Sequence, residues 1–414
     1  MTDLRILNRP RMTEYVVASD VLAKDDFILI DVGVSSGLDA HWRHFGKHLR
    51  AVGFDPWIDE CRRLSDAEKN KNVSYVAALV GITDQTHWFH QKVPGEPGRN
   101  HREYGPDRIA MDPFVRSSAH KVGRASGRWE QPSAAMSSTK VQIDTFIRSS
   151  DLPHVDFIKI DTDGDDFESL LGCEGIIDSH QVLGFCLESQ FHGPVSDRTN
   201  TWANIDRFLR SKGFLLFDTS MHRYSRATLP APFETRIAAQ TRFGQLMWGD
   251  ALYFRDSGAP GYADYWSIHL APEKLLKLAC MFEIHCLPDC AADLIVAHRE
   301  VLDRIIDTRT LLDFLTPSLN GRQVTYDEYM HAFETRLEQF FPAGFKTGSI
   351  DLTAPDESLK TDERVTILEA QLEVLKQAIV LKDATIASQN YSLERQQALY
   401  AELLRQQLGM PDEA

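Results

Sequence analysis

An apolar run that stops at an acidic residue and passes into a glycine-containing loop, at residues 28–37, constrains the fold of this chain more than any other feature. The run predicts a buried strand that ends at Asp31, and Gly33 and Gly37 follow in the loop. Gly33 permits a tight turn that a Cβ would obstruct, and Gly37 lets the next helix start close to the strand. We expect such a loop to leave backbone N–H groups free for a polar ligand. The segment predicts a nucleotide-cofactor loop, although glycines after a first strand also serve packing alone.

A second short strand is predicted at residues 51–55, and it ends in Asp55. In dinucleotide-binding folds an acid about 20 residues after the loop accepts hydrogen bonds from the ribose hydroxyls. The loop is Gly-x-x-x-Gly and lacks the full Gly-x-Gly-x-x-Gly of pyrophosphate binders, which disfavours an NAD-linked dehydrogenase. S-adenosylmethionine fits better, because its ammonium suits Asp31 and its carboxylate suits the loop amides. The predicted cofactor-binding residues are Asp31, Gly33, Val34, Ser35, Gly37, Asp55, Pro56 and Ala78.

Strands and connections of helical length alternate along the first 260 residues. Five further strands are predicted at residues 73–80, 155–160, 182–188, 214–218 and 251–254. This order implies right-handed crossovers and a largely parallel, doubly wound α/β sheet covered on both faces, with ligands at the carboxyl ends of the strands. Those ends carry Asp31, Asp55, Ala78, Asp161, Glu188 and Asp218. We therefore expect an active site at this edge.

Three motifs follow one another in the middle of the chain: Ile143-Asp144-Thr145-Phe146, then Asp156 through Gly164, then Glu168 through Gly172. Together they resemble the FkbM family of S-adenosylmethionine-dependent methyltransferases, over roughly residues 28–255. The resemblance implies a Rossmann-like class I methyltransferase fold and O-methylation of a hydroxyl on a carbohydrate, glycoconjugate or related small molecule. The chain departs from the family at Asp163, where Glu is common, and at Asp165-Asp166, where small or apolar residues are usual.

Methyl transfer from a sulfonium to a hydroxyl requires in-line approach and a group that accepts the hydroxyl proton. His192 follows Glu188 by four residues past the predicted fifth strand, and His222 follows the sixth. Because imidazole titrates near neutral pH, either histidine suits a general base, and Asp161 is the other contender. The predicted catalytic residues are Asp161, Glu188, His192 and His222. Trp248 and Tyr253 serve either as the lining of an acceptor pocket or as core aromatics.

Three alternating acids, Asp161, Asp163 and Asp165, invite a metal interpretation, but position six of a calcium loop is then Asp166 and position twelve is Gly172. A calcium loop requires Gly and Glu there. Magnesium held by Asp161 or Asp163 with Glu188 stays open. For Asp165 and Asp166 the simpler prediction is capping of the helix that follows.

Four potential zinc ligands, Cys280, His285, Cys286 and Cys290, lie close together in the sequence. Their spacing contains no Cys-x-x-Cys pair, which disfavours zinc. The other cysteines are scattered, which indicates reduced thiols and, with an N-terminus lacking a hydrophobic signal core, a cytoplasmic location.

Composition and charge argue against a membrane-spanning segment and against nucleic acid as a substrate. The chain of 414 residues is 43% hydrophobic, and no apolar run approaches the ~20 residues of a membrane span. A formal charge of −15 repels phosphate backbones, so nucleic acid is not expected as a substrate.

Four segments are predicted: a methyltransferase-like domain at residues 1–260, a helical appendage at 261–345, a linker at 346–360 and a coiled-coil helix at 361–409. The last rests on Leu368, Leu372, Leu375, Ile379 and later apolar residues at three- and four-residue steps. It predicts a homo-oligomer or docking onto a partner, and a single helix packed on the domain is the alternative. Residues 87–137 read as a substrate-side insertion. A non-catalytic scaffold that keeps the fold remains the second functional hypothesis.

Overall fold

The computed structural model describes residues 4–82, 118, 137, 139–162, 164–179, 182–193, 196–234 and 240–341. The chain divides into two compact units, Met1–Glu334 and Thr335–Ala414. In the second unit the described part contains one short helix, η3 (Leu337–Phe340). The predicted linker and coiled coil, most of the predicted insertion and Asp163 lie outside the described residues.

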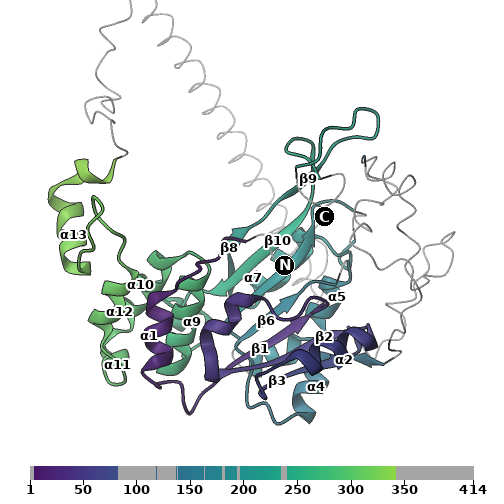
Figure 1. Ribbon diagram of the computed structural model, residues 1–414, viewed down its shortest axis with the longest axis horizontal. Helices are drawn as coiled ribbons and strands as arrows, with labels where there is room; N and C mark the ends of the chain where they lie inside the picture. The colour runs from purple at the N-terminus through teal and green to yellow at the C-terminus, as the bar shows by residue number, and fades with distance from the viewer. Residues whose placement is uncertain are drawn as a thin grey trace, which may run out of the picture. The chain divides into compact units, whose positions relative to one another are not determined.

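The first unit is built on an eight-stranded sheet with the order β3–β2–β1–β6–β7–β10–β8, and β9 pairs with β10 (Figure 1). The strands β3, β2, β1, β6 and β7 are parallel, and β10 runs antiparallel to its neighbours. Their bounds are β1 Phe27–Val32, β2 Leu49–Asp55, β3 Val73–Ala77, β6 Phe157–Ile160, β7 Gly184–Gln190, β8 Phe214–Thr219, β9 His222–Tyr224 and β10 Gln245–Arg255. This confirms the predicted Rossmann-like, largely parallel sheet.

The single strand predicted at residues 73–80 is wrong, because the chain turns at Ala78. The Ala78 N–H donates to the Asp55 carbonyl oxygen, at 3.0 Å, and β3 ends one residue earlier. The next two residues, β4 (Leu79–Val80), pair instead with β5 (Lys140–Val141) in a separate two-stranded sheet. Ala78 therefore lies beside the carboxyl end of β2.

Helices cover both faces of the sheet. Along β1, all of whose residues are buried, the side chains alternate between two hydrophobic cores: Phe27 and Leu29 belong to one, and Ile28, Ile30 and Val32 to the other. The first core contains residues of α1, η1 and α2 and of the helices between residues 272 and 315, and the second contains residues of α4, α5, α6 and α7. The bounds are α1 Arg11–Ala18, η1 Ala40–His48, α2 Ile58–Ala67, α4 Ile143–Ser149, α5 Asp166–Leu171, α6 Glu174–Ser179 and α7 Trp202–Ser211. Burial of one large apolar side chain stabilises a fold by about 1.5–3 kcal/mol, so each core is a major source of stability.

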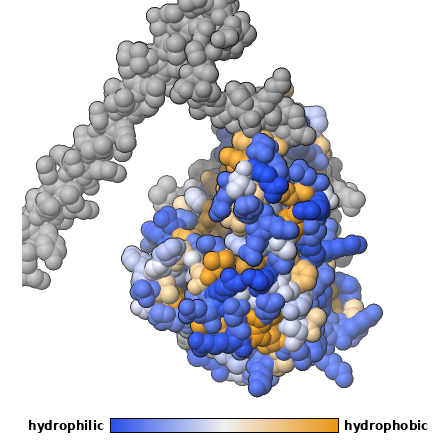
Figure 2. All heavy atoms as spheres, turned by 90° about the vertical axis from the view of Figure 1, so that its left-hand side faces the viewer, coloured by the Kyte–Doolittle hydropathy of each residue, from blue (hydrophilic) through white to orange (hydrophobic). Residues whose placement is uncertain are grey.

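The segment after residue 261 is helical, as predicted, and shares the first core with the sheet. Its helices are α8 Tyr262–Trp266, α9 Pro272–Ile284, α10 Pro288–Ala297, α11 Arg299–Leu302, α12 Thr308–Leu315 and α13 Tyr326–Thr335. Every residue of α9 from Lys274 to Ile284 is buried. Figure 2 views the side of the molecule that carries α10 to α12 and shows hydrophilic residues interspersed with hydrophobic ones. In the part of the chain that the structure describes, no helix is long and apolar enough to cross a membrane.

Two buried charges of α9 join it to the amino-terminal edge of the sheet. Lys274 Nζ lies 2.6 Å from Asp156 Oδ1, and Lys277 Nζ lies 3.2 Å from Asp156 Oδ2. The second oxygen also accepts the backbone N–H of Ile28, at 2.8 Å, and lies 3.0 Å from His154 Nε2. Burial opposes ionisation of Asp156, but its cationic neighbours hold the pKa of this carboxyl well below its usual range. Charge pairing thus fixes α9 to the start of β6.

A third charge of α9 completes the end of another helix. Glu283 accepts the backbone N–H groups of Met12 and Thr13, at 2.9 and 2.7 Å, in the first turn of α1. These N–H groups have no partner within their own helix, so a buried carboxylate from a distant helix satisfies them.

Candidate active site

The loop after β1 is bound tightly to the end of β2. The N–H groups of Gly33 and Val34 both donate to the Phe54 carbonyl oxygen, at 2.8 and 3.1 Å, and the Gly37 N–H donates to the Val34 carbonyl oxygen, at 2.7 Å. Gly33 has φ +88°, and a Cβ built on it would lie 1.7 Å from the carbonyl oxygen of Asp161. Gly33 is therefore required by the close approach of the loops that follow β1 and β6.

The expectation that the loop leaves its amides free is wrong for Gly33, Val34 and Gly37, because all three N–H groups donate within the protein. The Val34 side chain is buried, and a Cβ on Gly53 would lie 2.8 Å from it. Ser35 is exposed. The loop thus turns Val34 inward and Ser35 outward.

A buried cation lies between two acids at the centre of the sheet edge. Lys159 is the register partner of Asp31 on adjacent parallel strands, and its Nζ lies 3.4 Å from Asp31 Oδ1 and 3.5 Å from Asp161 Oδ2. Burial disfavours the charge of Lys159, but the two carboxylates overcome it and hold the pKa of this amine well above its usual range. Asp31 is 1% exposed, and burial raises its pKa to about 6. Among the described residues its Oδ2 has no hydrogen-bond partner.

A second buried carboxylate, Asp55, ends β2. Its Oδ1 accepts the Trp57 N–H at 2.9 Å, and burial raises its pKa to about 6. The Ala78 N–H binds the main chain of Asp55, and the Pro56 carbonyl oxygen accepts the Ser137 N–H at 2.7 Å. Asp55, Pro56 and Ala78 thus come together at neighbouring strand ends, as the parallel sheet requires.

The loop after β6 is held by the first residue of α5. Asp166 Oδ1 accepts the N–H of Thr162, at 2.8 Å, and Oδ2 accepts the N–H of Gly164, at 3.1 Å. Asn200 Nδ2 donates to the same Oδ2, at 3.0 Å. Asp166 had been predicted to cap the helix, but its carboxylate binds N–H groups that precede the helix.

Glu188, His192 and His222, which were predicted to take part in catalysis, lie in three different elements of the fold. Glu188 lies in β7, is buried, and faces Asp250 across the β7–β10 register. His192 is partly buried in the loop after β7. His222 lies in β9, beyond β7 and β10 in the sheet order, and its ring stacks on Trp248 with centroids 3.9 Å apart. His222 therefore belongs to an aromatic stack on β9, and strands β7 and β10 separate β9 from β6.

The two aromatics considered for an acceptor pocket have different surroundings. Tyr253 is fully buried, and its hydroxyl lies 3.3 Å from Asp206 Oδ1 of α7, so it belongs to the core. Trp248 is partly buried against His222, and its Nε1 lies 3.4 Å from the hydroxyl of Tyr224. Of the pair, only Trp248 has an exposed part.

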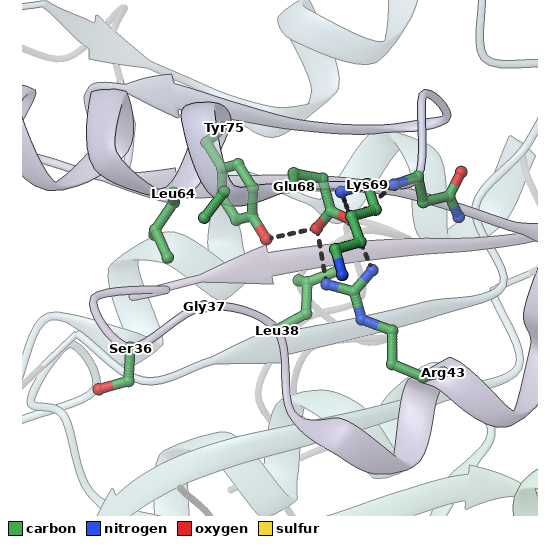
Figure 3. Close-up of a pocket in the computed structure, with 10 residues that line it drawn as sticks. Ser36, Gly37, Leu38, Arg43, Leu64, Glu68, Lys69 and Tyr75 are labelled. Carbon is green, nitrogen blue, oxygen red and sulfur yellow. Dashed lines mark hydrogen bonds and ion pairs between the residues drawn. The ribbon is translucent and has the colours of Figure 1, made fainter.

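A surface pocket of about 440 Å³ adjoins the glycine loop, between η1 and α2 (Figure 3). Arg43 and Tyr75 converge there on Glu68: the guanidinium donates to both carboxylate oxygens, at 3.0 and 2.6 Å, and the Tyr75 hydroxyl donates at 3.0 Å. Glu68 also accepts the N–H groups of Lys69 and Asn70. Because Arg43 and Tyr75 both donate to Glu68, this group joins η1 to the end of α2.

No three His, Cys, Asp or Glu side chains in the described ranges are grouped so that they could hold a metal ion. Cys280 and His285, two of the four residues weighed for zinc, are buried in the first core or against its aromatic rings. Asp163, one of the three acids considered for magnesium, lies outside the described residues.

Three residues of this edge were missed by the sequence reasoning: Lys159, Asp166 as a loop anchor, and Asn200. Lys159 carried a readable signal, since a charged residue stands inside the otherwise apolar strand Phe157–Ile160. A buried lysine requires a partner, and parallel pairing with β1 supplies Asp31. Asn200 carried no such signal, because its partner is set by the packing of two loops.

Comparison with known proteins locates one family. A model of the methyltransferase FkbM domain matches residues 40–216. No curated protein matches the sequence. Among solved structures, a precorrin-6y C5,15-methyltransferase from Geobacter metallireducens is 12% identical, with 62% of this chain and 93% of that chain covered and a TM-score of 0.25. A magnesium protoporphyrin IX methyltransferase from Synechocystis with bound S-adenosylhomocysteine is 9% identical, with 60% and 83% covered and a TM-score of 0.24. The TM-scores are low, so what these comparisons contribute is the family match.

Proposed function

The chain carries an FkbM methyltransferase domain over residues 40–216, and on this premise we propose that it transfers the methyl group of S-adenosylmethionine to a hydroxyl of a carbohydrate, glycoconjugate or related small molecule. The glycine loop and Asp31 lie just before the matched residues. The domain supports a methyltransferase, and the cofactor and acceptor are the proposed part.

One observation supports the cofactor: Asp31 and Asp55 are buried carboxylates at adjacent strand ends, and burial raises the pKa of both to about 6. Asp31 has an oxygen with no hydrogen-bond partner among the described residues, and one oxygen of the Asp55 carboxylate accepts the Trp57 N–H. Burying a charge without partners is costly, so both acids suit a ligand that brings donors. The cofactor ammonium would supply donors to Asp31, and the ribose hydroxyls would supply them to Asp55.

The bound cofactor supplies an electrophilic methyl group, and the residues of this chain orient the acceptor and take its proton. We assign Asp161 to orientation, because its main chain touches Gly33 and its carboxylate is paired with Lys159. We assign His192 to proton acceptance, because it is a partly exposed imidazole just past β7, and histidine is the most common general base. Glu188 and His222 remain proposed site residues in supporting positions.

The other expectations stay proposals: a cytoplasmic protein, without nucleic acid as substrate, that assembles or docks through residues 361–409. Size-exclusion chromatography with light scattering on the full chain and on a chain ending at residue 341 tests the assembly. A loss of oligomer in the shorter chain is expected.

Calorimetric titration of S-adenosylmethionine tests the cofactor. Wild type should bind saturably, Asp55→Ala should bind at least tenfold more weakly because the ribose loses a charged acceptor, and NAD should not bind. Asp59→Ala is the matched control, since Asp59 is exposed on α2 and pairs with Arg62, and it should bind as wild type does.

Once the cofactor is established, transfer of a labelled methyl group to mono- and oligosaccharide acceptors tests the hydroxyl class. Absence of binding to wild type would remove the enzyme proposal and favour a non-catalytic scaffold. Binding with transfer to amines or carboxylates, and none to hydroxyls, would contradict the acceptor class alone.

A further inference from the structure

The hydrogen bonds of Asp166 continue beyond the loop that it holds. Asn200 donates its Nδ2 to Asp166 and accepts the N–H of Phe167, at 2.9 Å, through its Oδ1. Both ends of the side-chain amide are therefore committed, and its orientation is fixed. Asp166 itself is fully buried, where hydrogen bonds to a carboxylate are strong and a mispaired group is costly.

The segment that carries Asn200 is itself fastened to a helix. Asn204 of α7 donates its Nδ2 to the carbonyl oxygens of Ser196 and Thr199, both at 2.8 Å. A continuous chain of polar contacts therefore runs from α7 through Asn200 and Asp166 to the amides of Thr162 and Gly164. It ends beside Asp161.

The residues that this chain fixes are those that meet the glycine loop. Asp161 places its carbonyl oxygen where only a glycine at position 33 fits, and its carboxylate lies 3.5 Å from Lys159. A small movement of the loop after β6 would therefore disturb both the glycine loop and the Asp31–Lys159–Asp161 charges. Positioning errors of about 1 Å are enough to impair a site of this kind.

We propose that Asp166 and Asn200 are positioning residues of the methyltransferase site: they fix the loop that carries Asp161, and neither touches cofactor or acceptor. The expected effect on cofactor binding rests on the proposed function, and the positioning itself rests on the hydrogen bonds of Asp166 and Asn200. It also gives the acidic departure at position 166 a role other than helix capping.

Exchanging the two side chains tests the pair. Asp166→Asn places an NH₂ group against that of Asn200 and loses the bond to Gly164, whereas Asn200→Asp places two carboxylates against each other. Each single variant should bind S-adenosylmethionine about tenfold more weakly or worse, because a displaced loop misplaces Asp161 and the glycine loop. The double variant Asp166→Asn/Asn200→Asp restores a donor–acceptor pair between the loops and should regain much of the affinity, less the contribution of the Gly164 bond.

Asp144→Asn is the matched control. Asp144 is also a buried aspartate that accepts two backbone N–H groups, from Gly175 and Ile176 at 2.7 and 2.8 Å, but these lie at the start of α6. This variant should lose stability comparably and keep its affinity when binding is measured well below its Tm.

Hydrogen exchange of the Thr162 and Gly164 amides supplies a readout that needs no cofactor. Exchange should be faster in both single variants than in wild type and Asp144→Asn, and slower again at Thr162 in the double variant. If the single variants lose stability yet keep wild-type affinity and exchange, the pair is merely structural and the proposal is overturned. If wild type binds no S-adenosylmethionine, the proposed function fails, while unchanged exchange would independently reject the geometric claim.

Discussion

The two ends of the sheet each bury an aspartate next to a lysine, and the two aspartates behave in opposite ways. At the amino-terminal edge, both oxygens of Asp156 are paired, with Lys274 and Lys277 among the partners, and its pKa lies well below the usual range. At the carboxyl-terminal edge, Asp31 has one oxygen 3.4 Å from Lys159 and the other without a partner among the described residues, and burial raises its pKa to about 6.

The difference in pairing distinguishes a structural ion cluster, at Asp156, from a candidate ligand-binding site, at Asp31. A completely paired buried charge joins α9 to the sheet and offers nothing to a ligand. An incompletely paired one leaves a free-energy cost that a donor-bearing ligand can relieve. The same residue types therefore have different roles because their hydrogen-bond complements differ.

The largest expected effect is on stability at the amino-terminal edge. Asp156→Asn removes the anion from between two buried lysines, and breaking a buried ion pair in this way costs about 3–5 kcal/mol. Urea unfolding should show this loss, whereas Asp151→Asn, at an exposed residue paired with Arg50, should change little. Cofactor affinity of the folded Asp156→Asn protein should stay near that of wild type. A large fall in affinity would contradict a purely structural role for Asp156.

The next effect concerns the backbone of the carboxyl-terminal edge. Gly33→Ala adds a Cβ at 1.7 Å from a main-chain oxygen to the strain of a positive φ, so stability and cofactor binding should both fall sharply. Gly321→Ala isolates the strain, since Gly321 has φ +76° with no atom within 4 Å of the added Cβ, and left-handed backbone costs a non-glycine residue about 1–2 kcal/mol. Equal losses in the two variants would argue against a required close approach at Gly33.

Asp31→Asn should reverse the pattern of Asp156→Asn. The free energy of unfolding should change less than in Asp156→Asn, because burial already penalises the Asp31 charge and Lys159 keeps Asp161 as a partner. Affinity for S-adenosylmethionine should fall roughly 10- to 100-fold, the usual effect of losing a hydrogen bond to a charged group. Calorimetry and thermal unfolding of one sample measure both, and a destabilised protein with intact affinity would make Asp31 structural.

The smallest effect is the response to pH. Asp31 and Asp55, with pKa values of about 6, take up protons in the folded state before the unfolded chain does, so their contribution to stability rises as pH falls through 6. Asp156, whose pKa is lowered, contributes stability that is lost only as pH falls below the unfolded value near 3.8.

Between pH 7.5 and 5.5, cofactor affinity should therefore fall about four- to twentyfold as one or both of these carboxylates protonate. Titrations at several pH values measure this, and Asp31→Asn should reduce the slope. A flat profile in wild type would contradict the involvement of both acids.

Much of this arrangement was predictable from the sequence. Periodicity and the acids that terminate apolar runs placed Asp31, Asp55 and Asp161 at one edge, and the strand order confirms the predicted sheet. The prediction of free loop amides was wrong, because two of these N–H groups donate to the Phe54 carbonyl oxygen of β2, which only strand pairing brings near. The continuous strand at residues 73–80 failed for a similar reason, since Ala78 is recruited by Asp55.

By itself the sequence determined where the main strands of the sheet lie and that position 33 has no side chain, because these follow from local periodicity and backbone sterics. Only the tertiary structure decided which buried charges are paired and which are left incomplete. Asp156 meets Lys274 across 118 residues of chain, and Asp31 meets Lys159 across 128. The pKa of a buried acid depends on such distant partners and on the water that packing removes, and neither is encoded in the neighbouring residues.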